Sequence, residues 1–131
     1  IIIQALNNKK EIKLGNVGTS RDFTYVTDSC HAFLDILKIK NFFGNTLNVG
    51  SHNEYKIDDI AKKILRKLNS RAKIKKEIQR TRSLKSEVFR LVCDNSKILK
   101  NTQWKPKVKI ENGLDMTINL FRKFKDLLIT N

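Results

Sequence analysis

Residues 21–28 read Arg-Asp-Phe-Thr-Tyr-Val-Thr-Asp, and they decide how the neighbouring segments are interpreted. The middle of this stretch, 23–26, holds aromatic and β-branched side chains, which predicts a short strand. Thr27 can then cap a helix that continues to about Lys40. The apolar positions of that helix are Ala32, Phe33, Ile36, Leu37 and Ile39. The stretch is therefore expected to join a strand to a helix, with Arg21 at its start.

The segments on either side of this stretch alternate between helical and extended patterns. Residues 1–8 read as the end of a helix, and 11–14 alternate as a short strand. Residues 15–20 form a loop by composition. Residues 46–49 are expected to form another strand, which ends at Gly50.

The second half of the chain continues the alternation. Apolar residues at spacings of three and four predict an amphipathic helix over 57–68. Residues 80–87 have no period and are expected to form a loop. Strand-like segments are expected at 74–78 and 88–92, and helices at 96–101, capped by Asp94 or Asn95, and at 111–128. Helices and short strands interleave, so the predicted fold class is mixed α/β, with one lobe over residues 1–131.

The chain is strongly basic, with 27 Lys and Arg against 13 Asp and Glu and a net charge of +14. Such an excess attracts polyanions, and the run 62–85 concentrates it without an interleaved aromatic residue. Lys, Asn and Ile are all abundant, which also fits an A/T-rich coding background. Compositional drift, an anionic small substrate and a nucleic-acid partner therefore all stay open.

The motifs of several catalytic classes are missing from the sequence. It contains neither GxGxxG nor GxxxxGK[ST], which excludes the usual dinucleotide and P-loop cradles. Tyr25 and Tyr55 have no Lys four residues later, so a Tyr-Lys proton-transfer pair is absent. His31 and His52 have no second ligand at metal spacing. No catalytic residue and no metal site are predicted.

Two cysteines and the hydropathy pattern bear on the compartment. Cys30 and Cys93 form neither a CxxC motif nor a disulfide framework, and both are expected to be core thiols. No apolar run approaches the length of a membrane span, and the N-terminus does not resemble a signal peptide. A cytoplasmic location with no membrane partner is expected.

Two arginines stand out among the lysines. Arg21 follows a Gly-containing loop, and Arg82 lies in the aperiodic loop before Glu87. A guanidinium group presents a planar fork that matches phosphate oxygens. A carboxylate five residues after Arg82 can accept hydrogen bonds from sugar hydroxyls. For either arginine alone an ordinary surface charge is the alternative, and the functional interpretation is a site for a phosphate-bearing sugar compound.

Residues 21–28 resemble the RDFTYVxD block of the extended short-chain dehydrogenase/reductase family, and more narrowly its nucleotide-sugar epimerases and 4,6-dehydratases. Five further segments resemble blocks of this family in the same order, namely 10–16 (its short strand), 47–51 (NxGs), 82–88 (RPxxSEV), 94–106 (DNSKA…LGWxP) and 113–118 (GLxxTI). The similarity is greatest to the bacterial sugar-nucleotide 4,6-dehydratases. The chain departs from the family pattern at Ser83, at 101–103 and at Leu120, where Pro, Leu-Leu-Gly and Trp are usual.

The resemblance implies the C-terminal, substrate-binding lobe of such an enzyme, without the Rossmann cofactor domain. By position, Arg21 and Arg82 would clamp the diphosphate of a nucleotide sugar. Glu87 would hold ribose hydroxyls, and Leu14 and Asn16 would line the base pocket. The intact family uses NAD and a Tyr-Lys pair, so this fragment is expected to bind no cofactor and to be inactive alone.

The resemblance leaves several matters open. Dehydratase and epimerase activity, the base and the sugar are not distinguished. The partner of the chain is expected to be a nucleotide-diphosphate sugar, with a separate Rossmann half or a second copy as further partners. The alternatives are a small basic nucleic-acid-binding module and a decayed or split-gene remnant.

Overall fold

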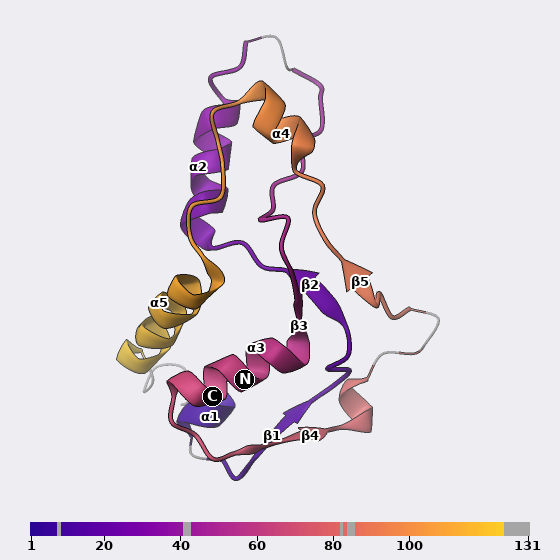
Figure 1. Cartoon of the computed structure of the whole chain (residues 1–131), viewed down its shortest axis with the longest axis vertical. Helices are drawn as coiled ribbons and strands as arrows, with labels where there is room; N and C mark the ends of the chain where they lie inside the picture. The colour runs from indigo at the N-terminus through magenta and orange to yellow at the C-terminus, as the bar shows by residue number, and fades with distance from the viewer. Residues whose placement is uncertain (8, 41–42, 82, 84–85, 125–131) are drawn as a thin grey trace. The chain divides into compact units, whose positions relative to one another are not determined.

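The computed structural model describes residues 1–7, 9–40, 43–81, 83 and 86–124 (Figure 1). The elements are α1 (Ile2–Leu6), β1 (Glu11–Leu14), β2 (Ser20–Asp22), α2 (Val26–Ile36), β3 (Glu54–Lys56), α3 (Ile57–Lys67), β4 (Lys73–Lys76), the 3₁₀ turn η1 (Ile78–Arg80), β5 (Arg90–Leu91), α4 (Ser96–Asn101) and α5 (Ile110–Lys123). The mixed α/β class predicted from the sequence is confirmed.

The described residues divide into two compact units. The first unit comprises the described residues of Ile1–Thr19, Lys56–Phe89 and Leu114–Asn131. The second comprises Ser20–Tyr55 and Arg90–Gly113. Each unit has its own sheet, β1-β4 in the first and β3-β2-β5 in the second. Each also has its own cluster of buried apolar side chains.

The first unit is built on a parallel pair of strands. Ile12 of β1 lies opposite Ile74 of β4 and is completely buried. Ala5 and Leu65 complete this core, with Ile1, Leu14, Leu68, Ala72 and Ile74 packed around it. The predicted strand over 11–14 is therefore confirmed, since Ile12 is buried in the core and its neighbours Glu11 and Lys13 are exposed.

Helix α3 supplies the other side of this core. Its buried residues, Ile60, Ala61, Ile64 and Leu65, recur at helical spacing, which confirms the predicted amphipathic helix. Asp58 and Asp59 lie in its first turn and Arg66 and Lys67 in its last, as the helix dipole favours. The helix ends because Asn69 adopts a left-handed φ of 52° and the N–H of Ser70 donates to the carbonyl of Leu65.

The second unit packs around Trp104, Ala32 and Ile98, which are all almost fully buried. The indole N–H of Trp104 donates to the carbonyl oxygen of Asp28 over 2.8 Å. The Asp28 side chain accepts hydrogen bonds from the N–H groups of Lys107 and Val108, at 3.0 and 2.9 Å. Asp28 thus ties α2 to the segment that precedes α5 through three hydrogen bonds.

Two predicted strands are wrong. Residues 23–25 have no regular structure, because β2 ends at Asp22 and α2 already begins at Val26. Residues 46–49 pair with no strand among the described residues, although Leu47 and Val49 pack against the core of the second unit. Leu47 and Val49 therefore pack against the core although their segment belongs to neither of the two sheets.

Other boundaries shift from their predicted positions. Helix α2 ends at Ile36, and Thr27 lies inside its first turn while Tyr25 is the N-cap. Strand β5 spans only Arg90–Leu91 of the expected 88–92. Helix α4 matches its predicted bounds, with Asn95 at the N-cap and the Asp94 carboxylate accepting from Ser96. Ile118 of α5 is buried as expected. Leu128, also expected in this stripe, lies outside the described residues.

Candidate functional site

The end of β1 is packed directly against η1, the turn that precedes residues 81–87. The N–H of Glu77 donates to the carbonyl of Leu14 over 2.7 Å. A Cβ atom on Gly15 would overlap the backbone carbonyl of Arg80, so the two backbones touch only because residue 15 is glycine. Leu14 and Gly15 therefore lie beside Arg80, which precedes the predicted site residues Arg82 and Glu87 in the sequence.

Asn16 shapes the loop between β1 and β2. Its side-chain oxygen accepts a hydrogen bond from the N–H of Gly18 over 3.1 Å. Its backbone carbonyl accepts another from the Thr19 hydroxyl over 3.2 Å. The loop is joined to α3, because the carbonyls of Val17 and Thr19 accept from the N–H groups of Asp58 and Ile57. Asn16 is thus held in a defined turn and half-exposed.

Charged groups surround this junction in the first unit. The Glu77 carboxylate pairs with Arg80 and, over 3.2 Å, with Lys13. Hydrogen bonds from Arg80 and then from Lys13 lower the pKa of Glu77. Arg80 is therefore engaged by Glu77, and Arg82, two residues later, is the arginine that the sequence assigns to phosphate binding.

The structure places the predicted site residues in both units. Leu14, Asn16 and Glu87 belong to the first unit, and Glu87 is half-buried. Arg82 lies outside the described residues. Arg21 is in β2 of the second unit, where its guanidinium donates to the carbonyl of Ser20 over 2.7 Å. Convergence of Arg21 and Arg82 on one diphosphate stays a prediction.

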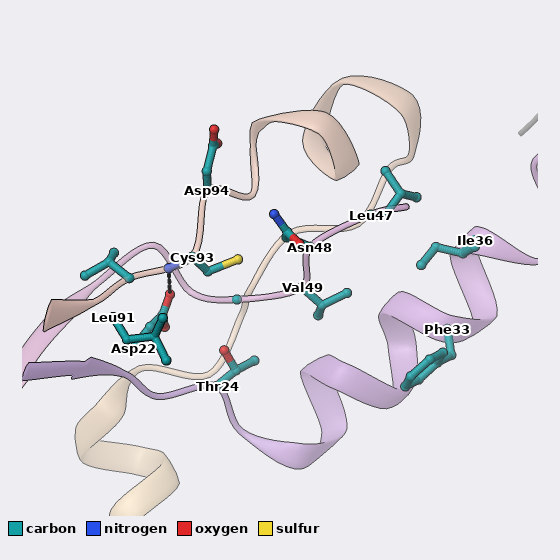
Figure 2. A pocket seen from close by; sticks show the side chains of 12 residues that line it. Asp22, Thr24, Phe33, Ile36, Leu47, Asn48, Val49, Leu91, Cys93 and Asp94 are labelled. Carbon is teal, nitrogen blue, oxygen red and sulfur yellow. Dashed lines mark hydrogen bonds between the residues drawn. The ribbon is translucent and has the colours of Figure 1, made fainter. Parts of the chain in front are cut away.

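The second unit contains a carboxylate network that sequence reasoning missed. Asp22 accepts hydrogen bonds from the N–H and hydroxyl of Ser51, at 3.0 and 2.5 Å, and from the N–H of His52 at 2.8 Å. The N–H of Cys93 adds a fourth at 3.3 Å, drawn in Figure 2. The only sequence signal was the position of Asp22 in the same block as Arg21. Its partners are distant in sequence, so no local pattern could identify them.

Gly50 makes this network possible. A Cβ on Gly50 would stand 2.6 Å from the Cys93 sulfur and 2.9 Å from an Asp22 oxygen, so no side chain fits there. His52 follows in a left-handed conformation with φ of 60° and its ring Nδ1 lies 2.7 Å from the Cys93 carbonyl. The segment around Gly50 is therefore held against Asp22 of β2 and against Cys93, two residues after β5.

A cavity of about 600 Å³ lies next to this network. Its apolar walls include Phe33 and Ile36 of α2, Leu47, Val49 and Leu91 (Figure 2). Its polar lining includes Asp22, Asn48 and Asp94. None of the four described site residues predicted from the sequence lines this cavity, so it is a feature separate from the predicted nucleotide pocket.

The two cysteines differ in their surroundings. Cys30 is exposed on α2, so the expectation that it is a core thiol is wrong. Its position on the side of α2 away from Ala32 explains the exposure. Cys93 is half-buried in the cavity wall, and its burial, followed by the nearby charges of Asp22 and Asp94, raises the pKa of its thiol. Within the described ranges, no cluster of His, Cys, Asp and Glu could hold a metal ion.

Comparison with known proteins identifies the family. The family model of GDP-mannose 4,6 dehydratase matches residues 1–117. The chain belongs to the NAD-dependent nucleotide-sugar epimerase/dehydratase family. This confirms the resemblance carried by residues 21–28 and the accompanying blocks.

Individual members of the epimerase/dehydratase family agree. The dTDP-glucose 4,6-dehydratase of Escherichia coli is 30% identical over 96% of this chain and 37% of its own length. The UDP-glucuronic acid 4-epimerase of Bacillus cereus, solved with UDP-glucuronic acid and NAD, is 25% identical with a TM-score of 0.82. That match covers 94% of this chain and 38% of the epimerase.

The fold is that of the C-terminal part of these enzymes. An epimerase of Methanothermobacter thermautotrophicus superimposes with a TM-score of 0.86 at 21% identity, over 97% of this chain and 37% of its own. The chain thus spans a little over one third of the family members it matches. Searched over its described residues, this family member has no helix that is both long and apolar enough to cross a bilayer.

Proposed function

We propose that this chain is the substrate-binding portion of an NAD-dependent nucleotide-sugar 4,6-dehydratase or 4-epimerase, that it binds the nucleotide diphosphate, and that it is not catalytic alone. Membership of the family supports the substrate class. The Escherichia coli relative is a dTDP-glucose 4,6-dehydratase, and the Bacillus cereus relative was solved with UDP-glucuronic acid.

The contact between Gly15 and Arg80 is the observation that carries this proposal. It brings the end of β1, with Leu14 and Asn16, against Arg80, the last residue of η1. Leu14 and Asn16 thus flank a backbone contact with Arg80, and Arg82 and Glu87 follow that residue in the sequence. We infer that a nucleotide is bound by both segments at once.

Each residue has a defined chemical task in this proposal. Leu14 offers an apolar surface to the base, and backbone groups near Asn16 read its edge. Glu87 accepts hydrogen bonds from the ribose hydroxyls. Arg82 and Arg21 provide forked, charge-assisted hydrogen bonds to the diphosphate. All of these interactions bind and orient the substrate, and none of them breaks a bond.

Hydride transfer in this family depends on NAD. This sequence contains neither the Gly-rich dinucleotide motif nor a Tyr-Lys pair, so its residues do not fit the cofactor. We therefore assign cofactor binding and proton transfer to a Rossmann part that this sequence does not contain. That part also decides between water elimination, as in a dehydratase, and hydride return, as in an epimerase. The two free thiols fit a cytoplasmic setting.

Calorimetric titration with UDP and dTDP tests the proposal. We expect Arg21→Gln and Arg82→Gln each to weaken binding by about 10- to 100-fold, the usual value of a charge-assisted hydrogen bond. A Lys62→Gln/Lys63→Gln variant is the matched control, because it removes two charges from α3 outside the proposed site. Its affinity should stay within about twofold of the parent chain.

Two outcomes would contradict the proposal. One is the absence of nucleotide-diphosphate binding by the parent chain. The other is an equal loss of affinity in the arginine and lysine variants, which would indicate attraction by net charge alone. Product formation from a nucleotide sugar by the chain alone would refute the assignment of catalysis to the missing part.

A further inference from the structure

Arg21 lies between two residues that share the opposite face of β2. Because successive side chains of a strand alternate, Ser20 and Asp22 lie on one face of β2 and Arg21 lies on the other. β2 is the middle strand of its sheet, between β3 and β5 (Figure 1). Hydrogen bonds that hold Ser20 and Asp22 therefore also fix the stretch of backbone from which the Arg21 side chain extends.

Asp22 holds the backbone on the C-terminal side of Arg21. Its carboxylate accepts the N–H groups of Ser51, His52 and Cys93, at 3.0, 2.8 and 3.3 Å. These donors come from two segments that are distant in sequence from β2. The residue after Arg21 is thus held in place without any contribution from the guanidinium.

Glu54 of β3 holds the residue before Arg21. Ser20 is only 5% exposed, and its hydroxyl donates to one oxygen of the Glu54 carboxylate over 2.5 Å. The other carboxylate oxygen accepts from Nε of Arg90 over 2.9 Å. Since Arg90 of β5 lies opposite Ser20 in the sheet, the carboxylate connects all three strands at this position. The charge on both groups strengthens the hydrogen bond to Arg90.

The guanidinium of Arg21 is attached to the residue that Glu54 holds. It donates to the carbonyl oxygen of Ser20 over 2.7 Å. A movement of Ser20 would therefore displace both the base of the Arg21 side chain and the oxygen that holds its tip. A long side chain binds a ligand more tightly when its conformation is restricted beforehand.

We propose that Glu54 is a positioning residue for the diphosphate site, which through Ser20 holds the Arg21 guanidinium in the conformation that binds phosphate. This inference rests on the proposed function, since that function assigns phosphate binding to Arg21. It adds a residue that acts through Arg21 and does not contact the ligand.

The sign of the effect separates positioning from charge. The Glu54 carboxylate is negative, so its removal should strengthen the binding of an anionic ligand if charge alone mattered. Positioning requires the opposite result. We expect Glu54→Ala to weaken UDP binding by about three- to tenfold in a calorimetric titration.

Asp35→Ala is the matched control. It also removes one carboxylate of the second unit that is paired with a cation, in this case Lys38. The affinity of this variant for UDP should stay within about twofold of the parent chain, because a distant charge is screened by salt.

A double variant shows whether Glu54 acts through Arg21. In a chain that already carries Arg21→Gln, Glu54→Ala should change UDP affinity by less than about twofold. A general loosening of the sheet would instead lower the affinity by the same factor in both backgrounds.

Ser20→Ala provides a second route to the same contact. It removes the hydroxyl donor rather than leaving it buried without an acceptor, so it tests the proposal even where Glu54→Ala unfolds. We expect it to weaken UDP binding by about the same factor as Glu54→Ala. Urea unfolding of both variants establishes that they are folded during the titration.

Several results would overturn this inference. Unchanged UDP affinity in Ser20→Ala or in folded Glu54→Ala, together with weakened binding in Arg21→Gln, contradicts the positioning role and leaves the proposed function intact. Additive losses in the double variant contradict it as well. Absence of UDP binding by the parent chain, or unchanged affinity in Arg21→Gln, contradicts the proposed function itself and the positioning role with it.

Discussion

At the scale of single residues, two close contacts are possible only because glycine, which has no side chain, lies at each of them. Gly15 allows the backbone of Arg80 to touch the end of β1, and Gly50 leaves room for Cys93 and Asp22. Neither glycine has a positive φ, so conformational freedom is not what either position requires. What both require is space, and this makes them sensitive to the smallest substitution.

We expect Gly15→Ala to lower the free energy of unfolding by about 1–3 kcal/mol, the usual cost of overpacking. It should also weaken UDP binding, because Arg80 and the loop after it must move. Gly18→Ala is the control, because the nearest atom to its new Cβ is the Asn16 side-chain oxygen at 3.4 Å. Urea unfolding and UDP titration of both variants provide the measurement. Equal stability and affinity in the two variants would contradict the role of the Gly15 contact.

Asp94 gives the chain a pH-dependent contribution to stability. The hydroxyl and then the backbone N–H of Ser96 donate to its carboxylate and lower its pKa below the ordinary value of 3.8. A lowered pKa in the folded state stabilises the fold above that ordinary value, and the contribution is lost as the pH falls through the lowered pKa.

We therefore expect the parent chain to lose more stability than Asp94→Asn between pH 6 and about pH 3. The measurement is the free energy of unfolding in urea at a series of pH values. Identical pH profiles would show that the contact with Ser96 does not stabilise α4.

At the scale of elements, α2 is held by one buried carboxylate. Asp28 is only 2% exposed and accepts the N–H groups of Lys107 and Val108, which lie just before α5. Asp35, on the same helix, instead forms an exposed pair with Lys38 over 2.7 Å. Burial, rather than the number of contacts, makes the first carboxylate the more important one.

Asp28→Ala should lower the free energy of unfolding by about 2–4 kcal/mol, because two backbone donors lose their acceptor inside the protein. Asp35→Ala should change it by less than about 1 kcal/mol, as for most surface ion pairs. Thermal or urea unfolding of the two variants checks the difference. A loss of similar size in both would mean that the Asp28 hydrogen bonds are replaced by water.

At the scale of the whole molecule, the net charge of +14 remains uncompensated despite local pairing. Lys62, Lys67 and Lys75 pair with Asp58, Asp115 and Glu11, all within the first unit. The remaining excess still attracts any polyanion, so weak binding to DNA at low salt is expected whatever the function of the chain.

A salt titration distinguishes this attraction from a specific site. Binding of random-sequence DNA should fall by several orders of magnitude between about 50 and 200 mM salt, because counterion release drives it. UDP binding should fall far less. DNA binding that persists at the higher salt and prefers one sequence would instead favour the nucleic-acid-binding module.

Local sequence patterns were sufficient to predict several helices and strands and to indicate the family. The spacing of Ile60, Ile64 and Leu65 predicted α3, and the alternation around Ile12 predicted β1 to the residue. Residues 21–28 carried the family resemblance that the comparison confirmed. These predictions are confirmed because the buried face of a helix or strand carries apolar residues at a regular spacing, which a short stretch of sequence shows.

Only the tertiary structure decided which extended segments pair and which residues meet. Residues 46–49 have a strand pattern but no partner among the described residues, because pairing depends on another segment's position. The contact of Gly15 with Arg80 and the hydrogen bond from Cys93 to Asp22 likewise join residues far apart in sequence. A sequence pattern reports which side chains avoid water, whereas hydrogen-bond partners and close backbone contacts depend on how distant segments come together.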